Sequence, residues 1–301
     1  MKFEKYLIIL STKAGTFDQK FIDEIKLQFE SKGMASNLEI FTITRANQVE
    51  EVVREFANKY GERGIVYVTG GDGTNSEGAR GVAGTGCTLG LIPMGTANDF
   101  YKVLKYSKEE ILKNITNPTV KPIDLMKIND KYCINICSLG FDTIVLKNTY
   151  DYLEKYKSLG KNAFILGVIK ALTSLKPQHI SYEMEKATGE VIEGEGDYLI
   201  TAICNGRFYG SGYQPSPMSE IDDGIFEIVL IEPLPLFKFL SLIKGYRKGT
   251  HIKESVVHIY PVVNAKLKLN EKVWGNIDGE LIHASEYNLK DCTKINFAFY
   301  E

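Results

Sequence analysis

Hydrophobic runs alternate with helical patterns along the first hundred residues. Residues 6–10 form a continuous apolar run, which is typical of a buried strand. Apolar residues at positions 17, 21, 25 and 29 then recur on one face of a predicted helix. Thr16 and Gln19 have the spacing of a capping box at the start of this helix, and Gly33 is placed to end it. The chain therefore opens with a strand followed by a helix.

Three more strands are predicted in the same region, over residues 38–44, 65–69 and 88–92, with a helix over residues 49–60. Their apolar runs are continuous and do not alternate with polar residues. Such runs are typical of parallel strands that helices cover on both faces. We therefore predict an N-terminal α/β domain.

The pattern changes after about Pro122. Segments of period 2, such as residues 180–185 and 266–269, replace the earlier alternation and predict a second domain rich in β-strands, a β-sandwich. Helices are expected within it over residues 162–175 and 236–246. Hairpin turns with positive φ are expected at Thr188-Gly189, at Asp222-Asp223-Gly224 and at Asp278-Gly279.

The length of 301 residues favours two domains, because single cores rarely grow beyond roughly 250–300 residues. We place the first domain at residues 1–124 and the second at residues 125–287. The pattern of the last predicted strand, 294–299, assigns it to neither domain. We therefore keep residues 288–301 as a candidate segment that completes the first domain.

Composition and charge exclude several classes of protein. With 44% hydrophobic and 25% charged residues the chain is not a disordered protein, and a net charge of −2 disfavours nucleic-acid binding by bulk charge.

The N-terminal apolar run is too short for a signal peptide, and we find no apolar stretch of the roughly 20 residues that span a bilayer. The five cysteines and four histidines lack zinc-ligand spacing. We expect a cytoplasmic protein.

A glycine-rich loop, Gly70-Gly71-Asp72-Gly73-Thr74, joins a predicted strand to a predicted helix. At a helix start the backbone N–H groups are free to bind phosphate oxygens, and glycines allow close approach. Asp72 would repel phosphates unless Mg²⁺ lay between them, which makes it a candidate metal-side ligand. The alternative is a tight turn that caps a helix.

A second loop, residues 95–99, follows the next strand and reaches the same rim of the sheet, where ligands bind. It too has the alternative interpretation of a capped helix start. Neither loop has the G-K-[ST] of a P-loop or the spacing of G-x-G-x-x-G. A dinucleotide site of the Rossmann type is therefore disfavoured.

Taken in order, these segments resemble the bacterial diacylglycerol-kinase family of lipid kinases, whose wider group includes sphingosine and ceramide kinases. The resemblance rests on six segments: G-G-D-G-T at 70–74 continuing to Glu77, I-P-M-G-T-A-N-D at 92–99, I-D-L at 123–125, I-N-I-C-S-L-G-F-D at 134–142, D-D-G at 222–224 and D-G-E at 278–280. NAD kinases and phosphofructokinases share the G-G-D-G loop. The resemblance implies an N-terminal domain like theirs, with the active site in the cleft between the two domains.

The resemblance also implies roles for individual residues. Asp72, Asp99 and Asp124 would organise the catalytic Mg²⁺, and Glu280 would be the general base. A second, structural Mg²⁺ would be bound by the carbonyls of Glu220 and Ile225 and by Asp223, although an ordinary turn is the alternative there. ATP would lie along Ser11, Thr12, Lys13, Ala14, Gly15, Thr44, Gly70, Gly71, Asp72, Gly73, Thr74, Asn75, Ser76, Glu77, Gly95, Thr96 and Asn98.

The predicted function is an ATP- and Mg²⁺-dependent lipid kinase that phosphorylates diacylglycerol or a related lipid, with phosphatidic acid as the simplest product. It would contact the inner face of the membrane transiently, through Lys102 and Lys105 beside Phe100 and Tyr101, or through residues 236–248. The family also suggests a homodimer.

Two alternatives stay open: a kinase of a soluble substrate such as NAD, and a catalytically silent lipid- or nucleotide-binding regulator, which the unusual residues 11–15 motivate.

Overall fold

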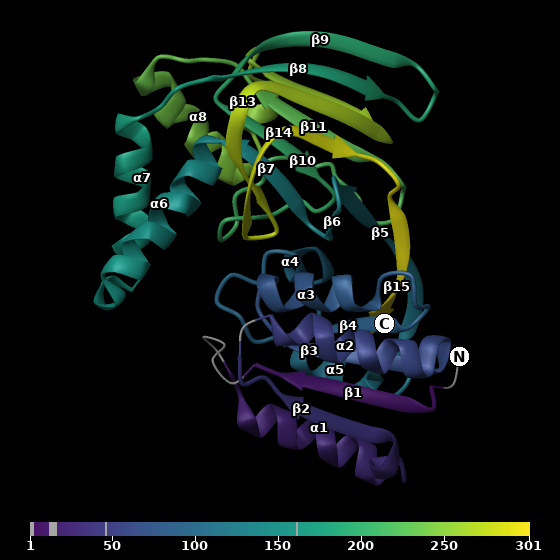
Figure 1. The fold of residues 1–301 in the computed structure, drawn as a ribbon. Coiled ribbons are helices and arrows are strands. Elements are labelled where there is room, and N and C mark those ends of the chain that lie inside the picture. The colour runs from purple at the N-terminus through teal and green to yellow at the C-terminus, as the bar shows by residue number, and fades with distance from the viewer. Residues whose placement is uncertain (1–2, 12–16, 46, 161) are drawn as a thin grey trace.

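A computed structural model of the chain describes residues 3–11, 17–45, 47–160 and 162–301. In its N-terminal part four parallel strands lie side by side in the order β2, β1, β3 and β4 (Figure 1). The strands span Lys5–Leu10 (β1), Leu38–Thr42 (β2), Gly64–Gly70 (β3) and Thr88–Pro93 (β4). The predicted parallel sheet is confirmed.

Helices cover both faces of this sheet. Leu7 and Val66 pack with α2 and α3, whereas Tyr6 and Ile65 pack with α1 and α5 on the opposite face. Alternate residues of one strand therefore enter different cores, which explains why the apolar runs are continuous. The helices span Gln19–Ser31 (α1), Gln48–Tyr60 (α2), Asp72–Val82 (α3), Tyr101–Leu104 (α4) and Lys108–Asn114 (α5).

The start of α1 differs from the predicted capping box. The N-cap is Asp18, whose side chain accepts a hydrogen bond of 3.1 Å from the Phe21 N–H. Gln19 is therefore the first residue of the helix and not the capping-box partner that the sequence predicts. Thr16 lies outside the described residues. Gly33 follows the helix end with φ of +67°, as expected of a glycine that ends a helix.

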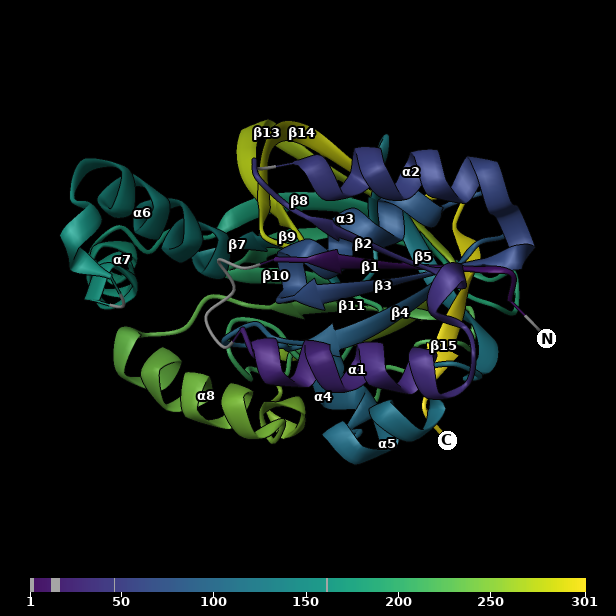
Figure 2. The ribbon, with the colours of Figure 1, turned by 90° about the horizontal axis from the view of Figure 1, so that it is seen from below.

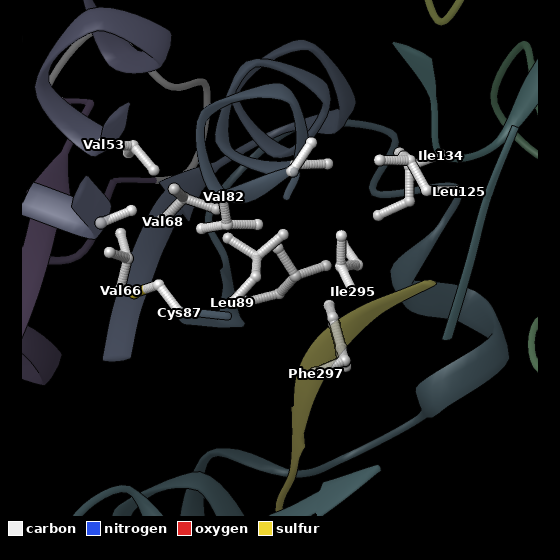
Figure 3. Close-up of a cluster of buried hydrophobic side chains, with 14 of the residues drawn as sticks. Val53, Val66, Val68, Val82, Cys87, Leu89, Leu125, Ile134, Ile295 and Phe297 are labelled. Atoms are coloured by element: carbon white, nitrogen blue, oxygen red, sulfur yellow. The ribbon is translucent and has the colours of Figure 1, made fainter. Parts of the chain in front are cut away.

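One strand, β5 (Thr119–Ile128), belongs to both halves of the molecule. Its first part pairs with β15 (Thr293–Phe299), and its last residues pair with β6 (Lys131–Cys133). The predicted boundary after residue 124 falls inside this strand. β15 itself lies between β4 and β5, and Figure 3 shows its Ile295 and Phe297 near Leu89 and Leu125 in the buried cluster.

The second half is built from antiparallel strands, which confirms the predicted β-rich domain. A sheet runs in the order β12, β11, β10, β7, β13 and β14, and the long strand β13 also pairs with β8. The strands span Ile136–Gly140 (β7), Gln178–Glu185 (β8), Val191–Tyr198 (β9), Ile200–Cys204 (β10), Phe226–Ile231 (β11), Val257–Val262 (β12), Asn264–Ile277 (β13) and Glu280–Leu289 (β14).

Three helices lie along one side of this domain (Figures 1 and 2). They are α6 (Phe141–Lys155), α7 (Asn162–Thr173) and α8 (Leu236–Lys248), and short 3₁₀ turns occupy Ala35–Asn37, Gly61–Arg63, Lys157–Leu159 and His251–Lys253. The sequence predicted α7 and α8 but not α6. None of the helices in the described part of the chain has the length and hydropathy to cross a bilayer.

Two of the three predicted hairpin turns are confirmed. Ile277 pairs with Glu280 across a two-residue loop in which Asp278 and Gly279 have φ of +49° and +95°, values typical of a type I′ turn. Gly189 lies in the loop of the β8–β9 hairpin. At 222–224 the positive φ is confirmed, at +74° for Gly224, but the turn belongs to a long loop of residues 205–225 between β10 and β11 and is not a tight hairpin turn.

Candidate active site

A cavity of about 630 Å³ lies between the two halves of the molecule. One part of its wall is polar and comes from the glycine-rich loop 70–74, the second loop 95–99 and the β13–β14 turn. The other part is apolar and comes from α6, α7 and α8. The polar part includes Gly71, Asp72, Gly73, Asn75, Ser76, Glu77, Thr96, Asp99, Asp278 and Glu280, and the apolar part includes Val145, Leu146, Phe164, Val168, Leu172, Leu240 and Ile243.

The glycine-rich loop 70–74 and the second loop 95–99 touch each other backbone to backbone. A Cβ atom added to Gly95 would lie 2.2 Å from the Cα of Gly71, so only glycine allows this approach. The Asn98 side chain bonds both backbone groups of Gly95, at 2.9 and 2.8 Å, and holds the second loop in its turn. Both loops therefore reach one rim of the sheet, as their positions after adjacent strands predict.

Asp72 lies at the first residue of α3 and lines the cavity. Its Oδ1 accepts a hydrogen bond of 3.0 Å from the Phe100 N–H, which ties the first loop to the second. Burial raises the pKa of Asp72, and the charge of the nearby Asp99 raises it further. The charge of Asp278 also raises the pKa of Asp72, while Lys102 pairs with Asp99 and offsets part of the repulsion among these carboxylates.

Asp99 joins the second loop to the β-rich domain. It is 3% exposed, forms an ion pair with Lys102, and accepts a hydrogen bond of 2.8 Å from the Ser211 N–H. Asp99 also lines the cavity, so the structure brings it together with Asp72.

Asp124 is not among the residues that line the cavity. Its carboxylate accepts a hydrogen bond of 2.7 Å from the Gly224 N–H and forms an ion pair of 3.2 Å with Lys294. These contacts attach the 221–224 turn and β15 to β5. Asp124 therefore links parts of the fold, and it is not among the cavity residues that include Asp72 and Asp99.

Glu280 is at the edge of the cavity, at the first residue of β14. Both of its oxygens are in ion pairs, at 2.6 Å from Arg80 Nη2 and 3.0 Å from Lys131 Nζ. Arg80 also bonds Glu50 and Ser76, at 2.6 and 3.0 Å. Because Arg80 lies on α3, the Glu280 carboxylate is held from the opposite side of the cleft.

Sequence reasoning missed Asp278 as a functional residue. Its carboxylate accepts hydrogen bonds from three consecutive backbone N–H groups, those of residues 134–136, at 2.8 to 3.1 Å. The hydroxyl of Ser76, on α3, donates to it at 3.0 Å. Asp278 thereby positions the turn that carries Glu280 against both halves. The Asp-Gly pair marked the turn, but nothing local marked these distant donors.

Several residues predicted to bind ATP have other contacts. Glu77 accepts a hydrogen bond of 3.1 Å from the Val49 N–H, at the start of α2. Thr44 is exposed and donates to Gln48 at 3.2 Å. Ser11, Thr44, Gly70, Thr74, Gly95 and Asn98 do not line the cavity, and Thr12, Lys13, Ala14 and Gly15 lie outside the described residues.

The second predicted Mg²⁺ site lies on the turn before β11. The Asp223 side chain accepts a hydrogen bond of 2.9 Å from the Ile225 N–H, and the Glu220 carboxylate pairs with Arg207. Across the described ranges, no three His, Cys, Asp or Glu side chains cluster in a way that could hold a metal ion. A site at Glu220, Asp223 and Ile225, which depends on carbonyls, stays a prediction.

In one predicted membrane contact the inclusion of Phe100 is wrong, whereas a contact through Tyr101, Lys102 and Lys105 stays a prediction. Phe100 is 1% exposed and packs against Phe297, so it is not available beside Lys102 and Lys105. On α8, in contrast, Phe237 is 71% exposed.

Comparisons with known proteins agree with this architecture. Residues 5–128 match the family described as "Diacylglycerol kinase catalytic domain", and residues 135–289 match the "YegS C-terminal NAD kinase beta sandwich-like domain". The chain is 30% identical to a protein named "Diacylglycerol kinase" from Bacillus subtilis (strain 168), over 91% of this chain and 88% of that protein. It is 32% identical to a "Probable lipid kinase YegS-like" from Pseudomonas aeruginosa PAO1, over 70% and 68% of the two chains.

Solved structures show the same fold. A diacylglycerol kinase from Bacillus anthracis str. Sterne matches with a TM-score of 0.70 at 20% identity, over 99% of this chain and 98% of that one. Another structure from the same organism gives a TM-score of 0.77 at 24% identity, with the same coverage. From its matched domains and its relatives, this chain belongs to the diacylglycerol kinase and YegS-like family of lipid kinases.

Proposed function

We propose that the protein is an ATP- and Mg²⁺-dependent kinase that transfers the γ-phosphoryl group to the hydroxyl of diacylglycerol or a related lipid alcohol. The observation that supports this most is the two-part cavity, in which a polar wall with the glycine-rich loops continues into an apolar wall from three helices. A nucleotide suits the first part and an acyl chain suits the second.

ATP would bind with its phosphates at the start of α3, where the N–H groups of the glycine-rich loop are available. Asp72 and Asp99 are hard oxygen donors and a repulsive pair, which fits Mg²⁺. When bound, Mg²⁺ would supply positive charge to the phosphates during transfer. Asp72 holds the two loops together, and Asp99 holds the β-rich domain to them.

In the proposed reaction the lipid hydroxyl oxygen attacks the γ-phosphorus, and the bond from that phosphorus to the β,γ-bridging oxygen breaks. ADP leaves, and Glu280 accepts the hydroxyl proton. Asp278 keeps Glu280 at the cavity edge, and Arg80 and Lys131 fix the direction of its carboxylate. The product is a lipid phosphate, and phosphatidic acid if the lipid is diacylglycerol.

The proposal is tested by incubating the full chain with γ-labelled ATP, Mg²⁺ and mixed micelles of detergent and 1,2-dioctanoylglycerol. We expect label in an organic-soluble product that requires both the lipid and Mg²⁺. A parallel reaction contains NAD and other soluble hydroxyl compounds. Label only there would indicate a soluble-substrate kinase, and no label despite measurable ATP binding would indicate a regulator.

Membrane contact is proposed at the ends of α7 and α8 that face solvent. Phe164 and Leu240 line the apolar part of the cavity and are also 43% and 44% exposed, so this part opens between the two helices. Further exposed apolar side chains lie on the same two helices, namely Ile165 and Ile169 on α7 and Leu236 and Phe237 on α8. Arg247 and Lys248 lie at the opposite end of α8 and give that end of the helix positive charge, which favours an anionic leaflet.

Phe237→Asp is expected to lower the affinity of the protein for phosphatidylglycerol vesicles about 30-fold. The reason is that burying one phenylalanine in the interface is worth about 2 kcal/mol. Sedimentation with vesicles measures the effect. Leu27→Asp, at a 60% exposed leucine on α1, is the matched control and should bind like the parent. Equal binding of all three proteins would contradict the proposed surface.

A further inference from the structure

The turn that carries Glu280 is contacted from both parts of the cavity. From the polar part, two side chains of α3 bond Asp278 and Glu280. From the apolar part, the hydroxyl of Tyr150 on α6 donates a hydrogen bond of 3.0 Å to the backbone carbonyl of Gly279. The helix that follows the glycine-rich loop and a helix of the apolar wall therefore meet at this turn.

Tyr150 lies beside both the apolar wall and the proposed base. It lines the cavity in the third turn of α6, one turn after Leu146 of the apolar wall and on the same face of the helix. Burial raises the pKa of the Tyr150 hydroxyl, and the charge of the nearby Glu280 carboxylate raises it further. The hydroxyl therefore keeps its proton at pH 7 and acts as the donor to Gly279.

A second contact joins α6 to the β13–β14 hairpin. The Nζ atom of Lys147, one turn before Tyr150, lies 5.7 Å from the ring centroid of Trp274 on β13. Beyond these residues α6 and α7 project to one side of the molecule (Figure 2), and Ile165 and Ile169 on α7 are more than half exposed. The contacts that hold α6 against the hairpin therefore lie beside the cavity.

An acyl chain in the apolar part of the cavity would pack against both helices. They line this part through residues such as Val145 and Leu146 on α6 and Val168 on α7. A long chain adds apolar contacts on the side of α6 that carries Tyr150, and a short chain leaves those contacts unmade. Interactions with a part of the substrate remote from the reacting bond can in this way raise kcat.

We propose that Tyr150 is a positioning residue that makes the placement of Glu280 depend on the acyl chain of the lipid acceptor. A long chain packs against α6, and the bond from Tyr150 to Gly279 then holds the turn with Glu280 in position to accept the hydroxyl proton. Acceptors with short chains bind but react slowly. This inference rests on the proposed lipid-kinase function and gives the acyl chain a role in the reaction step.

The test separates the effect of chain length on reaction from its effect on binding. Single-turnover rate constants are measured at saturating lipid with 1,2-dibutanoylglycerol and 1,2-dioctanoylglycerol in mixed micelles, with γ-labelled ATP and Mg²⁺. In the parent protein we expect the longer acceptor to react about 3- to 10-fold faster, the size expected of one hydrogen bond between neutral groups. Equal rate constants in the parent would overturn the inference.

Tyr150→Phe removes the hydroxyl and keeps the ring. It should lower the rate constant for dioctanoylglycerol about 3- to 10-fold and change that for dibutanoylglycerol less than about twofold, while the ratio of the two KM values stays the same. Tyr156→Phe is the matched control, since Tyr156 directly follows the last residue of α6 and is 49% exposed, and it should react like the parent. An equal loss with both acceptors in Tyr150→Phe would mean a structural role and would contradict the proposal.

The single tryptophan of the chain, Trp274, provides a second measurement that needs no variant. Because Lys147 of α6 lies over its ring, the emission of Trp274 reports on the contact between α6 and β13. Saturating the parent with 1,2-dioctanoyl-3-O-methylglycerol, which has no hydroxyl to react, should change this emission more than the dibutanoyl analogue does in the same micelles. Equal effects of the two lipids would overturn the inference.

The rate measurements also separate this inference from the proposed function. Transfer of label to both acceptors without an effect of chain length would overturn the role of Tyr150 and leave the lipid kinase intact. No transfer to any lipid would overturn the proposed function itself.

Discussion

Asp72→Asn is expected to lower the rate of phosphoryl transfer by roughly 10²–10³-fold and to leave the fold intact. Asparagine keeps an oxygen that can accept the Phe100 N–H, so the contact between the two loops survives. It removes the negative charge that we assign to Mg²⁺ binding, and phosphoryl transfer is accelerated mainly by positioning the reactants and stabilising their charge. Transfer of label from ATP to a lipid acceptor measures the rate.

Asp23→Asn provides the control for this variant. Asp23 is an exposed residue of α1 that pairs with Lys26, and its loss of charge should not change the rate. Thermal unfolding of both variants confirms that they fold. If Asp72→Asn kept more than a tenth of the parent rate, Asp72 would not be the metal-side ligand.

Gly95→Ala is expected to destabilise the protein by about 3 kcal/mol or more, because a methyl group at this position overlaps the backbone of Gly71. The two loops would have to separate, and the nucleotide site would be lost with them. Thermal unfolding should show a Tm lower by roughly 5–10 °C.

Gly73→Ala is the matched variant in the same pair of loops. A Cβ atom there meets no described atom within 4 Å, and alanine favours helix over glycine by about 1 kcal/mol, so the Tm should be equal or higher. If ATP phosphates approach the first turn of α3, however, this methyl group should reduce the rise in Tm that ATP causes. A normal response to ATP in Gly73→Ala would place the phosphates elsewhere.

The fold of the first half could be predicted because its signals are local. Continuous apolar strands and apolar helix faces depend only on neighbouring residues, and the structure buries them in the expected way. The missed helix α6 shows the limit of such signals. Its first turns carry the β-branched residues Thr143, Ile144 and Val145, and its stability comes from packing on α7, where Gly167 lies against Thr149.

The candidate site could be predicted in outline but not in detail. Asp72 and Asp99 follow adjacent strands, which is enough to bring them to one rim. The contacts of Glu280 with Arg80, and of Asp278 with Ser76, join residues about 200 positions apart and leave no pattern in the sequence. The contacts of Asp124 with Gly224 and Lys294 are equally distant in the sequence, and its role at the Mg²⁺ site stays a prediction.

The position of β15 has a consequence for the order in which the protein is made. The N-terminal sheet places this strand between β4 and β5, yet the ribosome reaches Thr293 only after the whole β-rich domain, residues 135–289. At about 5–20 residues per second, synthesis of that domain takes roughly 10–30 s. During this time Leu89 and Ile123 lack the strand that covers them in the finished protein, and the unpaired edge of β4 is open to wrong partners. While its second half is emerging, the nascent chain therefore carries an open strand edge and uncovered apolar residues, which are features that favour aggregation.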